Sequence, residues 1–304
     1  MSDLILHHYD TSPFSEKIKT ILGWKNLRWL AVEQPTIMPK PQLTPLTGGY
    51  RRIPVLQIGA DVYCDSQLIA RVIDALHPQR RVIPDGAHAV CATMSLWADR
   101  VFFPATLPLL FALVGDLLPP EFIEDRRQLA GGRIDFAGMA TQELPARQQL
   151  RACAALLDRQ LADGRPFLLG ADFSLADAAC YHPVWFLRSI PNAGSVFDEF
   201  GRLLGWADRI RALGHGQRQD VDRGEALHFA RFSDPLPGRG VDQGEAGLAT
   251  GAQVSVTPDD YGFDPVVGEL VTADPTEVAL RRRDPALGDV VVHFPRLGFV
   301  VRAL

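Results

Sequence analysis

The chain has 304 residues, of which 47% are hydrophobic and 22% charged, and its length predicts two or three globular domains with ample cores. The formal net charge is -5 and no long basic block is present, which argues against a nucleic-acid-binding protein. The short arginine run 281–283 is predicted to be one solvated patch.

No signal peptide or membrane span is predicted. An acidic residue, Asp3, lies at the N-terminus, and the apolar run after it ends at His7. The most apolar region, 102–118, is interrupted by two prolines and Asp116, which favours a pair of buried helices. The four cysteines are widely scattered, which predicts free, buried thiols in a reducing compartment rather than a zinc ribbon or a disulfide framework. We therefore expect a cytoplasmic protein.

A strand, a turn and a helix are predicted at the N-terminus. Residues 4–9 are apolar and β-forming, and residues 16–24 carry apolar side chains at helical spacing. In the turn between them, Ser12 followed by Pro13 predicts an N-cap with proline at the first helical position. The free N–H groups and the positive end of the helix would stabilise an anion near Ser12.

A hairpin and a second helix are predicted next. Residues 51–58 form a predicted strand entered through proline, 59–61 a turn and 62–64 the returning strand. Apolar residues repeat at helical spacing over 67–76, and Asp65 or Ser66 is the predicted cap of that helix.

Three motifs follow one another along these elements: the Ser-Pro-Phe-Ser turn at 12–15, the Ile-Pro-Val strand entry at 53–55 and the Asp-Ser helix start at 65–66. This order of elements and motifs resembles the N-terminal domain of the glutathione transferases. The resemblance implies an α/β thioredoxin-like, glutathione-binding domain over residues 1–78. The proline-rich loop 35–50 departs from the common pattern of the family, and we expect it to reshape one end of the site.

The segment 87–215 is predicted to be an all-α domain. Ser174 and Asp177 form a capping-box pattern, and residues 173–177 resemble the capped core helix of the glutathione transferase C-terminal domain. We expect Pro104 and Pro108 to kink or break the helix that contains them. Helical patterns cover residues 90–103, 144–161, 175–187 and 201–213.

The resemblance ends at about residue 214, and a β-rich C-terminal extension over 225–304 is predicted to follow a polar linker, 217–224. Its role stays open: it could cover the active site, extend a dimer interface or bind another molecule. Four short apolar or alternating runs predict a small β-barrel or a curled sheet. They cover 252–256, 266–271, 277–281 and 290–294.

The resemblance assigns Ser12 a role in thiol activation. A thiol with a pKa of about 8.5 is only a few per cent thiolate at neutral pH, and the thiolate is the nucleophile. The Ser12 hydroxyl would donate a hydrogen bond to the glutathione sulfur while the helix dipole favours its charge, with Ser15 and Tyr9 as alternatives. Glutaredoxin-like proteins carry cysteine at the Ser12 position and often at the Ser15 position, so we expect no dithiol exchange.

The other glutathione ligands also come from the resemblance. The backbone of Ile53 would pair with the cysteinyl part, next to Pro54 in the cis form. Asp65 would face the γ-glutamyl ammonium, and Ser66 with its amide would bind the γ-glutamyl carboxylate. Lys40 is the expected ligand of the glycyl carboxylate.

The sequence therefore predicts a homodimeric, glutathione transferase-like enzyme that uses glutathione as co-substrate, needs no metal and conjugates the thiolate to a hydrophobic electrophile. Trp97, Phe102 and Phe103 are candidates for the apolar wall of the electrophile pocket. His7 and His8 are a poor metal pair, because adjacent residues of a strand point to opposite faces. The alternatives are a non-catalytic protein of the same fold that binds a ligand or a protein partner, and a glutathione-dependent reductase or isomerase.

Overall fold

The first strand and helix lie where the sequence predicts them. The computed structural model describes residues 3–304, in which β1 (Ile5–His8) leads through a turn into α1 (Pro13–Lys25). Ser12 is the N-cap of α1, and its Oγ accepts a hydrogen bond from the Ser15 amide at 3.2 Å. The start of α1 is thus fixed by its own cap, as expected.

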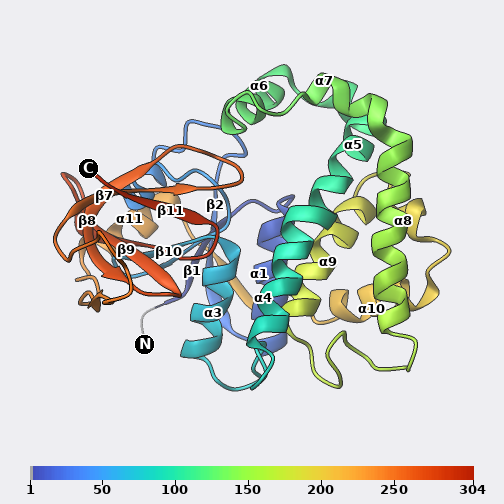
Figure 1. Ribbon diagram of the computed structural model, residues 1–304, viewed down its shortest axis with the longest axis horizontal. Coiled ribbons are helices and arrows are strands. Elements are labelled where there is room, and N and C mark those ends of the chain that lie inside the picture. The colour runs from blue at the N-terminus through green and yellow to red at the C-terminus, as the bar shows by residue number, and fades with distance from the viewer. Residues whose placement is uncertain (1–2) are drawn as a thin grey trace.

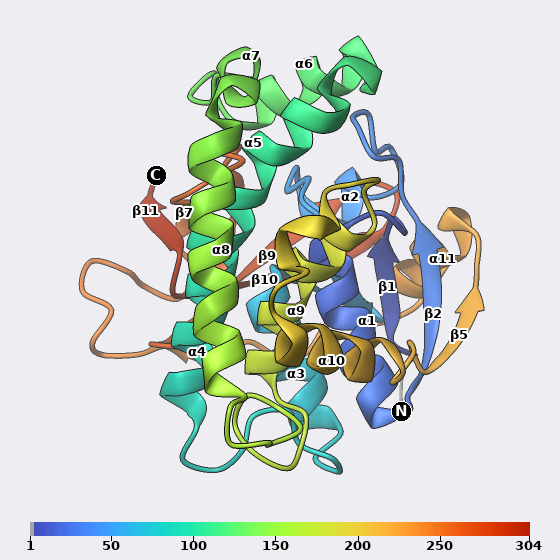
Figure 2. The ribbon, with the colours of Figure 1, turned by 90° about the vertical axis from the view of Figure 1, so that its right-hand side faces the viewer.

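The N-terminal domain is built on four strands. β1 pairs in parallel with β2 (Arg28–Glu33) and antiparallel with β3 (Val55–Ile58), which forms a hairpin with β4 (Asp61–Cys64). A one-turn helix, α2 (Thr44–Thr47), lies in the long loop between β2 and β3, and α3 (Ser66–Leu76) packs beside α1. α1 and α3 share their apolar core with the helical domain (Figure 2).

The chain returns to this sheet after the helical domain. β5 (Gln217–Asp220) pairs in parallel with β2, and α11 (Arg223–Arg231) places Ala226 against Ile5, Leu30 and Val32. The prediction of a linker at 217–224 is therefore wrong. The side chains of this segment are polar because β5 is an exposed edge strand, and its backbone pairing leaves no trace in the side-chain pattern.

A single long helical run crosses the helical domain, formed by α4 (His88–Trp97), a π-helical turn η1 (Ala98–Phe102) and α5 (Phe103–Val114). Of the expected kink or break at Pro104 and Pro108, the break is wrong, because the helical run continues through both. η1 shifts the hydrogen-bond register just before Pro104, which accommodates its missing N–H.

Within residues 3–304, one helical run, His88–Leu117, is long and apolar enough to span a membrane, with a mean hydropathy of 1.5. In the structure it packs on α8 and α9 as part of the helical domain. Only 22% of its most apolar window is buried, so much of its apolar surface is accessible.

The remaining helices complete the helical domain (Figure 1). The capping box of α9 is confirmed, and its Asp177 also accepts hydrogen bonds from the Trp206 indole at 2.9 Å and the Leu168 amide at 2.7 Å. The sequence did not predict α6 and α7. The remaining helices are α6 (Pro120–Leu129), α7 (Phe136–Met139), α8 (Glu143–Gln160), α9 (Leu175–Arg188) and α10 (Gly201–Arg211), with short turns η2 (Gly115–Leu117), η3 (Ala140–Gln142) and η4 (Gly194–Phe197).

The β-rich extension continues the sheet of the N-terminal domain. Its antiparallel strands end with β10, which pairs in parallel with β4, so that one eleven-stranded sheet runs through both parts (Figure 1). The expected β-rich extension is thus present, but it shares a core with the N-terminal domain, in which Val55 and Val62 pack with Val278 and Phe294. The strands are β6 (Gly240–Val241), β7 (Gln253–Pro258), β8 (Val266–Ala273), β9 (Glu277–Asp284), β10 (Gly288–Pro295) and β11 (Phe299–Ala303).

A buried histidine joins the two parts of this sheet. The Nε2 atom of His293 in β10 lies 2.9 Å from Asp61 in β4, and its Nδ1 atom lies 2.7 Å from Glu277 in β9. The ring stacks on Tyr63 at 4.4 Å. Burial alone would disfavour the charged ring, but the hydrogen bonds to Asp61 and Glu277 raise the pKa of His293. The two carboxylates at this joint therefore favour the charged form of the His293 ring.

We predict that His293→Gln costs less stability as the pH rises. A raised pKa means that the contribution of the charged ring is fully present below the unfolded-state value of 6.5 and is lost as the pH rises through the folded-state value. Urea denaturation at a series of pH values from 6.5 upward should show the free-energy difference from wild type shrinking. His228→Gln, at an exposed position of α11, is the control. A difference that grows with pH would contradict this account.

Candidate functional site

The sheet register brings the predicted site residues to one edge of the sheet. His7 pairs with Val55, and Val55 pairs with Cys64. Pro54 and Asp65 each lie one residue beyond these pairs, on the same side as the turn that leads from β1 into α1. Three segments that are separate in the sequence therefore meet where the helix α1 begins.

Ser12 lies at the centre of this edge. It is 1% exposed, its amide donates to the carbonyl of Tyr9 at 3.0 Å, and its hydroxyl hydrogen has no acceptor among residues 3–304. The neighbouring Ser15 hydroxyl is also buried and has no partner among these residues. Two hydroxyl donors are thus available at the positive end of α1, where an anion is favoured.

Ile53, Pro54, Asp65 and Ser66 flank the serine turn. The Ile53–Pro54 peptide bond is cis, as the resemblance implied. Asp65 caps α3, with its Oδ1 accepting the Gln67 amide at 2.9 Å, and Ser66 is the buried first residue of that helix. The backbone of Asp65 has a φ of 74°, a conformation that costs a non-glycine residue about 1–3 kcal/mol and is enriched at functional sites.

The charge of Asp65 is balanced by its neighbours. Burial raises the pKa of its carboxyl, while the Gln67 amide and the Arg52 guanidinium act in the opposite direction. A ligand ammonium at this position would add a further favourable partner for the carboxylate.

Lys40 belongs to the proline-rich loop, and its ammonium faces the protein. The side chain is buried, Nζ donates to the carbonyl of Pro35, and it lies 6.0 Å from the centre of the Tyr9 ring. Burial, helped by the charge of Arg126, lowers the pKa of Lys40 to about 8. A carboxylate bound here would supply the anion that this ammonium lacks.

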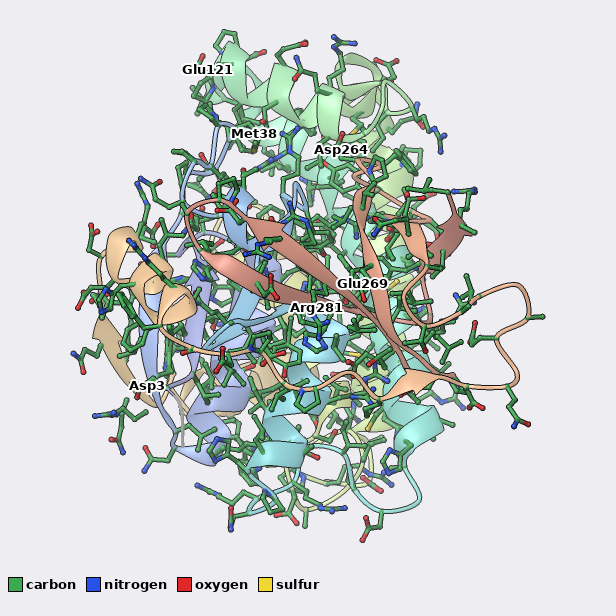
Figure 3. All side chains as sticks on the ribbon, turned by 90° about the vertical axis from the view of Figure 1, so that its left-hand side faces the viewer. Asp3, Met38, Glu121, Asp264, Glu269 and Arg281 are labelled. Atoms are coloured by element: carbon green, nitrogen blue, oxygen red, sulfur yellow. The ribbon has the colours of Figure 1, made fainter. Side chains whose placement is uncertain are left out.

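Helix α6 holds the proline-rich loop against the site. The buried Asp125 carboxylate accepts a hydrogen bond from the Met38 amide at 2.9 Å and forms ion pairs with Arg51 and Arg126. Arg126 also donates to the carbonyl of Thr36 at 2.8 Å. Figure 3 shows Met38 below α6, the helix that carries Glu121. Sequence reasoning missed Asp125 because its helix was not predicted.

An aromatic group borders the start of α1 on the side of the helical domain. The Phe14 ring lies 5.0 Å from Phe103 and 4.8 Å from His182, and Phe103 lies 5.7 Å from Phe186. These rings are partly exposed except for His182, which is buried. Phe103 therefore fits its predicted place in an apolar wall.

Two other wall candidates lie elsewhere. Phe102 is fully buried and packs edge-on against Phe197 in the helical core, and Trp97 leans on Phe102. Adjacent residues of a helix point in different directions, and here Phe102 is buried in the core while Phe103 is partly exposed.

A buried polar triad lies beneath this wall. The ammonium of Lys17, in α1, lies 2.8 Å from Asp99, and His182 Nε2 lies 3.0 Å from the same carboxylate. Although burial opposes ionisation, Lys17 and His182 lower the pKa of Asp99. Asp99 belongs to the π-helical turn η1, so this turn presents the carboxylate to both partners. The triad fixes α1 to the helical domain.

One further group of side chains has metal-ligand chemistry. His8, Asp10 and Glu33 offer ligand atoms within 4.8 Å of one another. However, the Arg218 guanidinium lies 2.8 Å from Asp10 and the Lys19 ammonium 3.7 Å from it. Two cations of the chain already occupy this group, which disfavours a metal ion there.

Comparisons with known proteins agree with this architecture. Residues 6–81 match the model of the glutathione S-transferase N-terminal domain, and residues 123–209 match that of the C-terminal domain. A GST-like protein from Pseudomonas syringae is 36% identical, with a TM-score of 0.82 and 100% of both chains covered. The match therefore includes the β-rich extension.

More distant structures cover a smaller share of this chain. A glutathione S-transferase from Rhodospirillum rubrum F11 is 19% identical with a TM-score of 0.54, over 69% of this chain and 91% of its own. The β-etherase LigF from Sphingobium sp. strain SYK-6 is 17% identical with a TM-score of 0.56, over 70% of this chain and 96% of its own. Among proteins of curated function, none matches the sequence significantly.

We predict that Asp125→Ala destabilises the protein. The substitution leaves Arg51 without its buried partner and the Met38 amide without an acceptor, which should lower the free energy of unfolding by about 3 kcal/mol. Urea denaturation measures this change. The matched control is Glu124→Ala, one residue earlier in α6, whose carboxylate pairs with Arg127 at the surface. Equal effects of the two substitutions would contradict the role given to Asp125.

Proposed function

Because the chain belongs to the glutathione S-transferase family, we propose that it binds reduced glutathione and conjugates its sulfur to a hydrophobic electrophile. The observation that carries this proposal is the convergence of Ser12, Ile53, Asp65 and Ser66 at one edge of the sheet, with the Ser12 hydroxyl free to donate. A cytoplasmic, metal-free enzyme is part of the same proposal.

Each end of glutathione has complementary groups in this arrangement. Asp65 offers a carboxylate to the γ-glutamyl ammonium, and the amide of Ser66, at the N-terminus of α3, offers a donor to the γ-glutamyl carboxylate. The backbone of Ile53 would pair with the cysteinyl residue, and Lys40 and Arg126 provide positive charge for the glycyl carboxylate.

The chemistry follows from the position of Ser12. Its hydroxyl donates a hydrogen bond to the glutathione sulfur, and the positive end of α1 favours the thiolate, whose proton passes to water. The thiolate then attacks an electrophilic carbon held against Phe14 and Phe103, a carbon–sulfur bond forms, and the leaving group departs with its electron pair. Ser12 keeps its proton throughout and forms no covalent bond.

We predict that Ser66→Ala and Ser12→Ala have different effects. Ser66→Ala should weaken glutathione binding in calorimetric titration, because it removes a ligand of the γ-glutamyl end. Ser12→Ala should leave binding nearly unchanged but raise the pKa of the bound thiol by about one unit, which is about 1.4 kcal/mol. The ultraviolet absorbance of the bound thiolate, titrated with pH, measures that pKa.

The control is Ser233→Ala, because Ser233 lies against Gly59 at the other end of the β3–β4 hairpin. Conjugation of an aromatic halide should slow in Ser12→Ala and stay normal in Ser233→Ala. An unchanged thiol pKa in Ser12→Ala would reassign the thiol contact to Ser15 or Tyr9. Glutathione binding without conjugation of any electrophile would instead favour the non-catalytic alternative.

We also propose a homodimer in which the apolar side of the helical run His88–Leu117 contacts a second copy. Val90 and Val101 on this run are 46% and 51% exposed, an unusual state for such an apolar helix. Light scattering should give twice the 33.5 kDa mass of one chain. Glutamate at both valines should yield a monomer, whereas Leu156→Glu, on the exposed side of α8, should not. A monomeric wild type would overturn this proposal.

A further inference from the structure

A loop of the β-rich extension contacts both of the other domains. Residues 259–264 connect β7 to β8 and are here called the strap. Asp259 pairs with Arg100 of η1 at 2.6 Å, and Asp260 pairs with Arg52 of the N-terminal domain at 2.6 Å. The Gly262 amide donates to the carbonyl of Leu129, the last residue of α6, at 2.9 Å. The hairpin that carries the strap reaches toward α6 in Figure 1.

The strap fits closely between α6 and Arg52. Gly262 has a φ of 71°, and a Cβ atom there would lie 2.9 Å from the Leu129 side chain and 3.1 Å from Arg52 Nε. The guanidinium of Arg133 lies 4.0 Å from the Phe263 ring. Figure 3 shows Asp264, the last strap residue, close below the helices α6 and α7. Only glycine has both the backbone freedom and the small size that this contact requires.

The strap lies beside the proposed glutathione site. Arg52, which Asp260 holds, directly precedes Ile53, and its guanidinium lies 5.7 Å from the Tyr261 ring. Burial raises the pKa of Tyr261, and the charge of Arg126 opposes this increase only in part. Tyr261 therefore stays protonated and shares the surroundings of Tyr9.

This is the side of the site on which Lys40 lies. The Lys40 ammonium lies 6.0 Å from the centre of the Tyr9 ring, and Arg126 of α6 donates to the carbonyl of Thr36 in the same loop at 2.8 Å. Neither the Tyr9 nor the Tyr261 hydroxyl makes a hydrogen bond to any residue within 3–304. Helix α6 thus contacts both the strap, through Leu129, and the loop that carries Lys40, through Asp125 and Arg126.

We propose that the strap closes the site at the glycyl end of bound glutathione and thereby limits the length of the peptide thiol that the site accepts. The proposal rests on the function proposed above. A thiol that ends in a carboxylate at the glycyl position can approach Lys40 and Tyr261, whereas a thiol extended there by another residue would collide with the strap or α6.

The strap is less suited to select the electrophile. The aromatic wall consists of Phe14, Phe103 and Phe186, and within residues 3–304 no ion pair or ring contact of the strap reaches these side chains. Displacing the strap should therefore change the choice of thiol more than the choice of electrophile.

The test compares two peptide thiols that both end in a carboxylate: glutathione itself, and γ-glutamyl-cysteinyl-glycyl-glycine, which is longer by one glycine. Calorimetric titration of the full chain should show that wild type binds glutathione at least about tenfold more tightly. Gly262→Ala pushes the strap away from Leu129 and Arg52, and should bring the two affinities within about threefold.

The control is Gly288→Ala in the β9–β10 turn of the same extension. Gly288 has a φ of 85°, but a Cβ atom there would have no neighbour within 4 Å, so alanine adds backbone strain without displacing another group. Its ratio of affinities should equal that of wild type. Asp260→Asn, which weakens the contact with Arg52, should shift the ratio in the same direction as Gly262→Ala.

Hydrogen exchange identifies whether the strap has moved. Faster exchange of the amide of residue 262 in Gly262→Ala than in Gly288→Ala would show displacement, and an unchanged ratio of affinities would then overturn the proposal. Equal affinities of wild type for both thiols would overturn it as well. No binding of glutathione to wild type would instead overturn the proposed function, on which the role of the strap depends. If Gly262→Ala does not fold, Asp260→Asn with Tyr261→Ala provides the same comparison.

Discussion

The parallel pairing of β10 with β4 is the constraint on which the arrangement of the molecule depends. β4 ends at Cys64, directly before the strained Asp65 and the start of α3, so the extension is attached to the strand that presents one half of the candidate site. Through β10 the same pairing places the rest of the extension, including the hairpin that carries the strap. The extension therefore behaves as part of the N-terminal domain, and the buried His293 is at the joint.

Much of the fold could be predicted because its signals are local. Ser12 with Pro13, and Ser174 with Asp177, mark helix starts within a few residues, and apolar spacing identified the principal helices. The pairing of β5 with β2 and of β10 with β4 could not be predicted in this way. A backbone hydrogen bond between strands requires no particular side chain, so the polar strand β5 resembles a linker.

The residues of the candidate site also differ in whether the sequence gives a local signal for them. The three motifs near Ser12, Pro54 and Asp65 were found in the sequence because each includes a turn or a cap with characteristic residues. The side chains that support them were not, because Lys17 and Asp99 lie 82 residues apart and their partnership depends on how two domains pack. Phe102 was misplaced for a related reason: composition identifies an aromatic helix, but the direction in which each ring points depends on the neighbouring helices.

The joint between β4 and β10 also has a consequence for biosynthesis. Asp61 and His293 are 232 residues apart, so β4 has no partner on its outer side until the intervening chain has been synthesised. An unpaired apolar strand edge is a template for pairing with another chain, and contacts of such long range form slowly. The outer edge of β4 therefore stays open during synthesis until β10 has been made, and the pairing of these two strands then closes it.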